Sequence, residues 1–460
     1  MKNYKNILLI IYFILLAVSV AVNLKFIYIL FVIAAGIILY KDFSVQSVWR
    51  VVVWAAMLPD NYSPIVILGL AGLYTLMAKR KEIKVDKAIM IPFGALLGVA
   101  FISTIINRVP LVNIVFALVY FSSIIIMMLI FGLLGTNFID KSIIFDLRIF
   151  MASQVVATIV RMAMTEEGFY IIKYDDWCTG TYGVSQCAIV YMTMMIGCIV
   201  ELMSLIQEKS KCVWRYLLLL SSAVVIIATQ CVLTMFLAAL FFFFGLISKK
   251  DKWSLLFTVI GIIGIVVSYY GITKIFPDKQ YYFDAVKQDQ ELSHMIFNKV
   301  NVYENTFLNF PSEDIKFALI GDGLGNYNSR AALTCSGYYV ELYNRFFQPS
   351  VSERVQAYLQ PQLKLAYEYG HMMFGSILYR PYSSLLAMMG ECGYIGVILF
   401  FIIFGVFYKR GDRMMHSLLL AYLSTCLLEN YLEYSKVIII LMVAMSVGYS
   451  TMNPENSSEE

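Results

Sequence analysis

The sequence predicts an all-α, polytopic integral membrane protein with about fourteen transmembrane helices and one long extracytoplasmic loop. Hydrophobic residues make up 60% of the 460 residues, charged residues make up 14%, and the mean hydropathy is +0.74. Soluble domains carry about 25% charged residues. One water-soluble core cannot bury this much apolar surface, so we expect the bilayer to be the solvent of the chain.

Apolar runs that are long enough, or nearly long enough, to cross a bilayer follow one another along the chain. The N-terminal run resembles a signal peptide, but a second run begins directly after it at Phe26, so we expect an uncleaved first span. The runs are Ile7–Val22, Phe26–Tyr40, Val45–Leu58, Ile65–Ala78, Ala88–Ile106, Leu111–Gly135, Ile143–Met164, Val184–Ile206, Tyr216–Thr229, Cys231–Ile247, Trp253–Tyr270, Tyr382–Phe407, Ser417–Leu428 and Val437–Tyr449.

The apolar stretch from Tyr216 to Ile247 is long for one span. As a single helix it would measure about 48 Å, whereas the bilayer core is about 30 Å thick. Both of its flanks are basic, which favours two crossings with a tight turn near Thr229–Gln230. One long tilted helix is the alternative, and it would reverse the orientation of everything that follows.

Basic linkers separate alternate runs: KNYK, KDFSVQSVWR, KRKEIKVDK, QEKSKCVWR, SKKDK and KRGDR. Short loops rich in Lys and Arg face the cytoplasm, so both termini are predicted to be cytoplasmic. This topology divides the chain into about eleven helices in residues 1–270, a large extracytoplasmic loop in residues 271–380, about three helices in residues 381–450, and a polar cytoplasmic tail in residues 451–460.

The long loop contains the Gly-rich turn GDGLGNY, in which Gly321, Gly323 and Gly325 alternate. Alternating glycines permit positive φ angles and the close approach of a ligand. A dinucleotide-binding fingerprint is excluded because it requires a βαβ unit around it. A purely structural turn is the alternative.

A second stretch of the loop, QPSVSERVQAYLQPQ, is amphipathic. Val351, Val355, Tyr358 and Leu359 lie on one side of the predicted helix. Such a helix either lies on the membrane surface or packs on neighbouring parts of the loop. The sequence does not decide between these two placements.

Ionisable residues near the predicted membrane boundary are the candidates for function. Glu391 lies at the mouth of a span, where it serves either chemistry or the start of a helix. The planar guanidinium group matches phosphate oxygens, so arginines near the loop are candidate diphosphate ligands, with headgroup contact as the alternative. These arginines are Arg161, Arg330 and Arg380.

Other classes of site lack support in the sequence. The eight cysteines form no CxxC pair and no zinc-like spacing with histidine, and the acidic residues form no cluster, so we expect neither a metal nor a cofactor. Cys178 and Cys335 both fall outside the predicted spans, and a disulfide between them is the less favoured alternative to two thiols. The charges form no stripe suited to nucleic acid.

Taken together, these features resemble the Wzy-type O-antigen and capsular polysaccharide polymerases and the related O-antigen ligases. That superfamily has many spans, a late extracytoplasmic loop with a GxGxGxY/F-like turn, and a PHNxxLxxLxExGxxG-like motif at the end of the loop. This chain has GDGLGNY and PYSSLLAMMGECGYIG, and GTYGVSQCA at 180–188 is similar to a mid-chain motif of the superfamily. The residues in register with the end motif are Pro381, Leu386, Glu391, Gly393 and Gly396.

The chain departs from the pattern at two places. Tyr382 replaces the histidine of the end motif and Ser383 the following Asn, and TQCVL at Thr229–Leu233 lacks an arginine often present there. The resemblance implies a glycosyltransferase of the bacterial inner membrane that uses undecaprenyl-diphosphate-linked glycans as donor and acceptor. Arg161, Arg330 and Arg380 would bind the diphosphate. His371, Glu391 or Tyr382 would take the acceptor proton.

The implied partners are the bilayer, a chain-length regulator and a repeat-unit flippase, without nucleic acid. An O-antigen ligase is the alternative within the same enzyme class. A flippase or exporter of lipid-linked oligosaccharide is the alternative from another class, because fourteen spans suit a transporter. Transporters usually show internal repeats. The sequence has no evident repeat and has one long late loop, which favours the polymerase.

Overall fold

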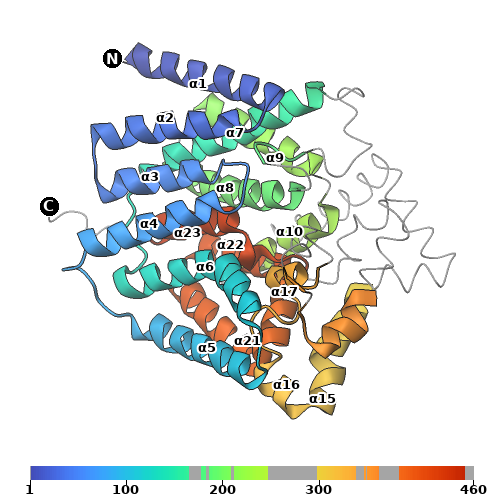
Figure 1. The fold of residues 1–460 in the computed structure, drawn as a ribbon. Helices are drawn as coiled ribbons and strands as arrows, with labels where there is room; N and C mark the ends of the chain where they lie inside the picture. The colour runs from blue at the N-terminus through green and yellow to red at the C-terminus, as the bar shows by residue number, and fades with distance from the viewer. Residues whose placement is uncertain are drawn as a thin grey trace.

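The computed structural model describes residues 2–164, 178–182, 186–208, 212–229, 231–246, 298–337, 347–348, 350–361 and 383–450, and all regular structure in these ranges is helical. Figure 1 shows the bundle. Its helices are α1 (Lys2–Val22), α2 (Phe26–Lys41), α3 (Val45–Ala55), α4 (Ser63–Ala78), α5 (Lys87–Ile106), α6 (Leu111–Leu134), α7 (Ile143–Met164), α8 (Cys187–Glu208), α9 (Val213–Ala228), α10 (Val232–Leu246), α21 (Ser384–Arg410), α22 (Arg413–Thr425) and α23 (Ser435–Ser450).

Shorter elements lie between α10 and α21. They are α14 (Asn298–Glu304), η1 (Asn305–Asn309), α15 (Phe310–Glu313), α16 (Ile315–Ile320), α17 (Arg330–Cys335) and η2 (Val355–Leu359), and η3 (Tyr431–Glu433) joins α22 to α23. The predicted span Trp253–Tyr270 lies outside the described residues.

The all-α class predicted from the sequence is confirmed, and the helices are those of a membrane protein. Five described helices, α5, α6, α7, α8 and α21, are long and apolar enough to cross a bilayer. Several others are shorter than the predicted runs: α3 has 11 residues, or about 17 Å. Trp49, Val52 and Val53 of α3 are buried, so its apolar character reflects core packing as well as membrane burial. The count of about fourteen spans stays a prediction.

The apolar stretch near residue 229 is divided into two helices. The first, α9, ends at Ala228, and the second, α10, begins at Val232. The prediction of two helices with a turn near Thr229–Gln230 is therefore confirmed, and a single long helix is excluded.

Helix ends alternate between two opposite faces of the bundle (Figure 1). We call one the basic face; it holds residues 41–44, 79–86, 135–142 and 411–412. There Gln46 Nε2 donates to Ser142 Oγ at 3.1 Å, and Arg410 pairs with Asp86. The start of α1 and the end of α23 lie at this face, as the predicted topology requires. Which side of a membrane the basic face occupies stays a prediction.

We call the opposite end the loop face; it holds residues 56–62, 107–110, 426–434 and the described parts of 298–361. Several contacts join these segments. Asn107 Nδ2 donates to Gly321 O at 3.0 Å, Ser435 Oγ donates to Asn61 O at 2.9 Å, and Tyr303 OH donates to Leu427 O at 2.6 Å. The late loop and the ends of the helices therefore form one packed layer.

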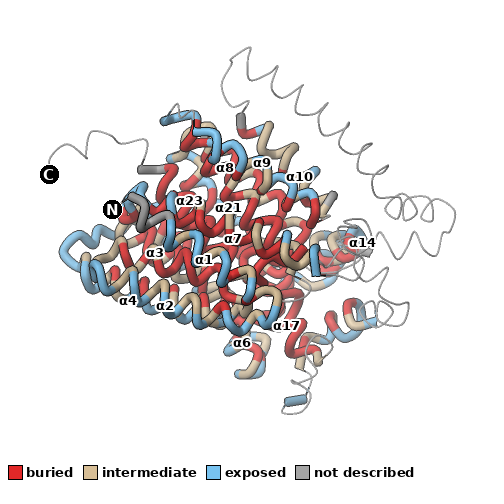
Figure 2. Tube along the Cα trace, turned by 90° about the horizontal axis from the view of Figure 1, so that it is seen from above, coloured by how far each residue is buried: buried red, intermediate tan, exposed pale blue. Residues whose placement is uncertain are grey.

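Burial is greatest in the middle of the bundle (Figure 2). Each residue from Val437 to Met445 in α23 has no exposed surface, so α23 is enclosed by the other helices. The outer sides of α4, α5 and α21 instead expose large apolar residues such as Leu70, Phe101 and Ile398. An apolar outer surface around a packed helical centre is the arrangement expected in a bilayer.

The amphipathic stretch of the loop packs on its neighbours. Val351, Val355 and Leu359 are buried in one apolar cluster with Phe310 and Phe317. Tyr358 is about half exposed, although its ring lies 5.0 Å from that of Phe310. Of the two placements left open by the sequence, the structure has the second, a helix that packs within the loop.

Candidate functional site

The Gly-rich turn and the end motif, predicted from separate parts of the sequence, meet at a break in α21. Gly393 has φ 65°, which interrupts the helix. The two carbonyl groups before the break accept hydrogen bonds from the turn: Asp322 N donates to Gly390 O at 2.7 Å, and Gly323 N donates to Glu391 O at 3.2 Å. The turn therefore satisfies backbone groups that an unbroken helix would satisfy itself.

Glycines make this approach possible. A Cβ on Gly321 would lie 2.6 Å from Gly390 O, and a Cβ on Gly325 would lie 2.5 Å from Asn113 O in α6. The ring of Tyr327 lies against Gly390, where a Cβ would overlap it. The turn is thus enclosed between α6 and α21, and its glycines serve close packing as well as backbone geometry.

Glu391 holds the turn from inside the bundle. Its side chain is 1% exposed, and its two carboxylate oxygens accept hydrogen bonds from Gly325 N at 2.8 Å and Ser329 N at 3.3 Å. A carboxylate with backbone N–H donors on both oxygens is strongly fixed. These contacts fit a structural role, and a role for Glu391 as proton acceptor stays a prediction.

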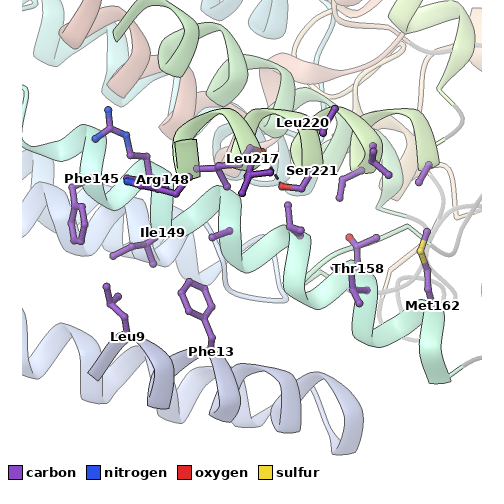
Figure 3. A pocket seen from close by; sticks show the side chains of 18 residues that line it. Leu9, Phe13, Phe145, Arg148, Ile149, Thr158, Met162, Leu217, Leu220 and Ser221 are labelled. Atoms are coloured by element: carbon purple, nitrogen blue, oxygen red, sulfur yellow. Dashed lines mark hydrogen bonds between the residues drawn. The ribbon is translucent and has the colours of Figure 1, made fainter. Parts of the chain in front are cut away.

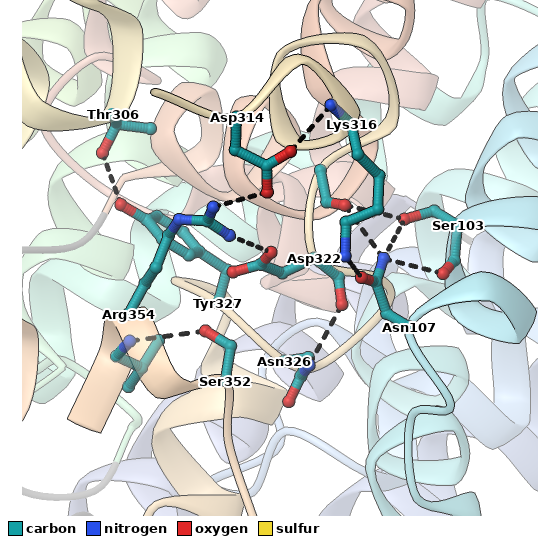
Figure 4. A network of polar contacts seen from close by, with 12 residues as sticks. Ser103, Asn107, Thr306, Asp314, Lys316, Asp322, Asn326, Tyr327, Ser352 and Arg354 are labelled. Atoms are coloured by element: carbon teal, nitrogen blue, oxygen red, sulfur yellow. Dashed lines mark hydrogen bonds and ion pairs between the residues drawn. The ribbon is translucent and has the colours of Figure 1, made fainter. Parts of the chain in front are cut away.

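An ion-pair network fixes the outer side of the turn (Figure 4). Arg354, next to η2, donates to Asp322 Oδ1 and to Asp314 Oδ2, each at 2.7 Å. Its guanidinium also lies 4.4 Å from the centre of the Phe317 ring. One arginine therefore joins η2, the turn and the start of α16, where Asp314 caps the helix by accepting from Lys316 N.

The pKa values of the two carboxyl groups in this network are shifted in opposite directions. Burial raises the pKa of Asp322 above its ordinary value, and the positive charge of Arg354 offsets only part of the effect. Burial also acts to raise the pKa of Asp314, but the hydrogen bond from Arg354 and two backbone N–H donors outweigh it and lower that pKa. The network therefore contains one carboxyl group whose pKa is raised and one whose pKa is lowered.

Arg330, the residue directly after the turn, is held between aromatic rings. Its Cζ lies 5.0 Å from the ring centre of Tyr120 and 4.5 Å from that of Tyr434. Its backbone N donates to Glu433 Oε2 at 2.7 Å. Burial and the nearby charge of Glu391 raise the pKa of Glu433 well above its ordinary value. The guanidinium is thus fixed at the point where the turn meets the α22–α23 connection.

A second cation, Lys436, lies at the start of α23. Its side chain has no exposed surface, and Nζ donates to Pro59 O at 3.1 Å and to Gln186 Oε1 at 3.3 Å. It also lies 3.8 Å from the ring centre of Tyr182. The backbone carbonyl of Tyr182 accepts a hydrogen bond from Arg161 Nη2 at 2.5 Å. Tyr182 therefore stands between two cations, one from α7 and one from α23.

Buried polar atoms that have no hydrogen-bond partner in the described part of the chain gather around these cations. Native proteins pair almost all such atoms, and exceptions are common at functional sites. The atoms are Asn430 Nδ2 and Oδ1, Glu433 Oε1, Tyr182 OH, Thr179 Oγ1 and Asn61 Oδ1. The α22–α23 connection contributes three of these six atoms, more than any other segment, and we take it as the centre of the candidate site.

The predicted site residues are thus placed in part. The structure brings Gly321, Gly323, Gly325, Glu391 and Arg330 together. Arg161 contacts Tyr182, which lies beside Lys436. The remaining predicted residues lie outside the described residues: His371, Arg380 and Tyr382.

Sequence reasoning missed several functional candidates. Arg354, Glu433 and Lys436 are not among the residues predicted from the sequence. For Glu433 and Lys436 the available signal is the string ENYLEYSK, which places three ionisable residues directly before a fully apolar run. Asp322 lies inside the Gly-rich turn, and the glycine pattern does not indicate its pairing with Arg354.

Two further expectations concern cysteines and metals. Neither Cys178 nor Cys335 forms a disulfide, and Cys178 Sγ lies 3.5 Å from Val225 O. The described residues contain no group of three or more His, Cys, Asp and Glu side chains placed to hold a metal ion.

No protein-family profile matches the sequence, and no curated protein is significantly similar to it.

Proposed function

We propose that this protein is a membrane glycosyltransferase that polymerises undecaprenyl-diphosphate-linked oligosaccharide units into a surface polysaccharide on the extracytoplasmic face. The hydroxyl oxygen of an acceptor sugar attacks the anomeric carbon of the donor glycan. The bond from that carbon to the diphosphate oxygen breaks, undecaprenyl diphosphate leaves, and the hydroxyl proton passes to a base.

The observation that carries the proposal is the contact between the two motifs. The turn GDGLGNY and the motif around Glu391 lie about 65 residues apart in the chain and carry the resemblance independently. Their direct packing at the break in α21 supports a joint role. The turn also delivers Arg330 to the loop face, where the resemblance requires a cation.

Positive charge on the leaving diphosphate is the main chemical requirement of this reaction. Fixed cations stabilise charge that develops in a transition state because they need no reorganisation. Arg161, Arg330 and Arg380 are the proposed diphosphate ligands. Lys436 lies beside Tyr182, whose backbone carbonyl accepts a hydrogen bond from Arg161. His371, Glu391 and Tyr382 are the proposed alternatives for the base.

Deletion of the gene tests the class of reaction. We expect lipid-linked single repeat units to accumulate on the outer leaflet, with loss of long glycan. Accumulation on the cytoplasmic leaflet alone would favour a flippase. Loss of transfer to a lipid core or a protein, with polymer still attached to its lipid, would favour a ligase.

Substitution of the arginines tests the site. Loss of one fixed donor to a developing charge costs roughly 2.7–4 kcal/mol, or about 100- to 1000-fold in rate. We therefore expect Arg161→Ala, Arg330→Ala and Arg380→Ala each to lose nearly all polymer. The corresponding lysine variants should be intermediate, because lysine keeps the charge but lacks the planar fork. The measurement is the polymer formed by purified enzyme from lipid-linked units.

Arg108→Ala is the matched control, because Arg108 lies at the same face but is exposed. It should polymerise as the wild type does. Tyr382→Phe separates a further role: if the phenol takes the proton, this change should reduce polymer as much as Arg380→Ala. Wild-type polymer from the three arginine-to-alanine variants at normal membrane levels would rule out the assignment.

A further inference from the structure

An apolar groove with a volume of about 870 Å³ runs between α1, α7 and α9. Figure 3 shows that α7 forms its floor and that the other two helices form its walls. Phe13 of α1, Ala152 and Ile149 of α7, and Leu217 and Val224 of α9 are among the side chains that line it. Aliphatic and aromatic groups dominate the lining, which therefore suits a hydrocarbon chain.

The groove is longer than one leaflet of a bilayer. Its lining residues on α7 begin at Phe145 and end at Met162, which corresponds to about 26 Å at the helical rise per residue. One leaflet contributes about half of a hydrocarbon core of roughly 30 Å. The acyl chain of a phospholipid stays within its own leaflet, whereas a long isoprenoid chain can follow the groove through most of the membrane.

The two ends of the groove differ in charge. At the end near the basic face, Arg148 Nε donates to Glu201 Oε2 at 2.7 Å, so its charge is neutralised by a buried carboxylate. At the other end, the lining residues Thr158 and Met162 flank Arg161 in the sequence. Arg161 Nη2 donates to the backbone carbonyl of Tyr182, and its buried Nε has no hydrogen-bond partner in the described part of the chain.

We propose that this groove binds the polyprenyl chain of a lipid-linked diphosphate, with the chain along α7 and the diphosphate at Arg161. The identity of the lipid rests on the proposed function, whereas the groove and the charge at its end do not. The donor then has one binding site for its isoprenoid tail and another for its diphosphate head. The diphosphate is then held at the loop face, where Tyr182 connects Arg161 to Lys436.

Binding of undecaprenyl diphosphate to the purified full-length protein in nanodiscs tests the proposal. Ala152→Phe fills the floor of the groove, and Ser221→Phe fills it from α9. We expect each to weaken binding at least about tenfold, since each CH₂ group removed from apolar contact costs roughly a factor of four. Ala95→Phe is the matched control, because Ala95 is exposed on α5, and it should bind as the wild type does.

A headgroup variant makes the test independent of packing. Arg161→Gln should weaken binding of undecaprenyl diphosphate about tenfold or more but leave binding of undecaprenol, which has no diphosphate, unchanged. Wild-type affinity in both Ala152→Phe and Ser221→Phe would overturn the proposal. Equal displacement of the probe by phosphatidylglycerol would also overturn it, because the groove would then be an ordinary lipid site.

The same variants separate this proposal from the proposed function. If the probe binds in the groove but the wild-type protein forms no polymer, the groove stands and the polymerase assignment fails. If the wild type forms polymer and the groove-filling variants bind and polymerise normally, the polymerase assignment stands and the groove proposal fails.

Discussion

The two faces of the bundle treat buried charge in different ways. Near the basic face, cations pair with carboxylates: Arg215 pairs with Glu201 and Glu208, and Arg50 Nε lies 2.8 Å from Asp146 Oδ2. Beneath the loop face, Arg330 lies between aromatic rings, and Lys436 donates to neutral oxygens. The printed contacts of the buried cations thus differ in kind between the two faces: carboxylates near the basic face, and aromatic rings and neutral oxygens beneath the loop face.

The loop face also contains an arginine that pairs with carboxylates, and this pairing stabilises the Gly-rich turn. Arg354 bonds two aspartates and holds the Gly-rich turn. The turn is thus anchored by charge pairing on its outer side and by Glu391 on its inner side.

Reporter fusions test whether the two faces lie on opposite sides of the membrane, and their outcome is all-or-none. The basic linkers predict a cytoplasmic basic face. A fusion after Glu82 should therefore fluoresce with a cytoplasmic reporter, and one after Asn309 should be active with an exported phosphatase. The same side for both fusions would remove the basis of the comparison.

Removal of a carboxylate near the basic face should destabilise the protein. Glu201 is 1% exposed, and its loss would leave Arg148 and Arg215 with only Glu208, a more exposed carboxylate, as their shared partner. Breaking a buried pair in this way typically costs about 3–5 kcal/mol. We expect Glu201→Ala to lower the thermal unfolding temperature of the detergent-solubilised protein.

The control for this change is Glu82→Ala at the same face. Glu82 pairs with Lys79, but its side chain is largely exposed, so its loss should cost less than about 1 kcal/mol. Similar unfolding temperatures for the two variants would show that the buried network contributes little. The ion pairs near the basic face would then not be what stabilises that part of the bundle.

The smallest expected effect is the pH dependence of the turn anchor. The pKa of Asp322 is raised by burial, so its contribution to stability is full below about pH 4 and is lost as pH rises through the raised pKa. The pKa of Asp314 is lowered despite burial, because Arg354 and backbone donors outweigh it. Its contribution is present above about pH 4 and is lost as pH falls through the lowered pKa.

The thermal unfolding temperature measured between pH 3 and pH 7 shows how the stability contribution of each aspartate changes with pH. Asp322→Asn should flatten the decline in stability above pH 4, and Asp314→Asn should flatten the decline below it. Identical pH profiles for the wild type and both variants would show that neither aspartate is coupled to folding. Asp140→Asn, at the basic face and exposed, is the control and should leave the profile unchanged.

The sequence predicted those features that depend on neighbouring residues. Helix positions follow from local runs of apolar residues, and the division at Ala228 follows from a run too long for one span. The glycines and Glu391 stood out because residue types with special geometry or charge are visible in a string. Local patterns therefore located most of the bundle and the two halves of the motif contact.

Features that depend on distant packing could not be predicted in the same way. The hydrogen bonds from the turn to Gly390 O and Glu391 O join segments about 70 residues apart. The pairing of Arg354 with Asp322 and the burial of Lys436 likewise arise only when helices from both ends of the chain meet. No periodicity or spacing in the sequence indicates which loop charges become enclosed.

The break at Gly393 has a consequence for how such loops can be exchanged between proteins. The carbonyl groups that the break releases are satisfied by the turn, and the turn is shaped to fit the broken helix. A chimera that takes the loop alone would leave those carbonyl groups without donors inside a membrane helix. The segment from 319 to 329 and the segment from 390 to 393 therefore have to be exchanged together, along with Arg354, which pairs with Asp322 in the turn.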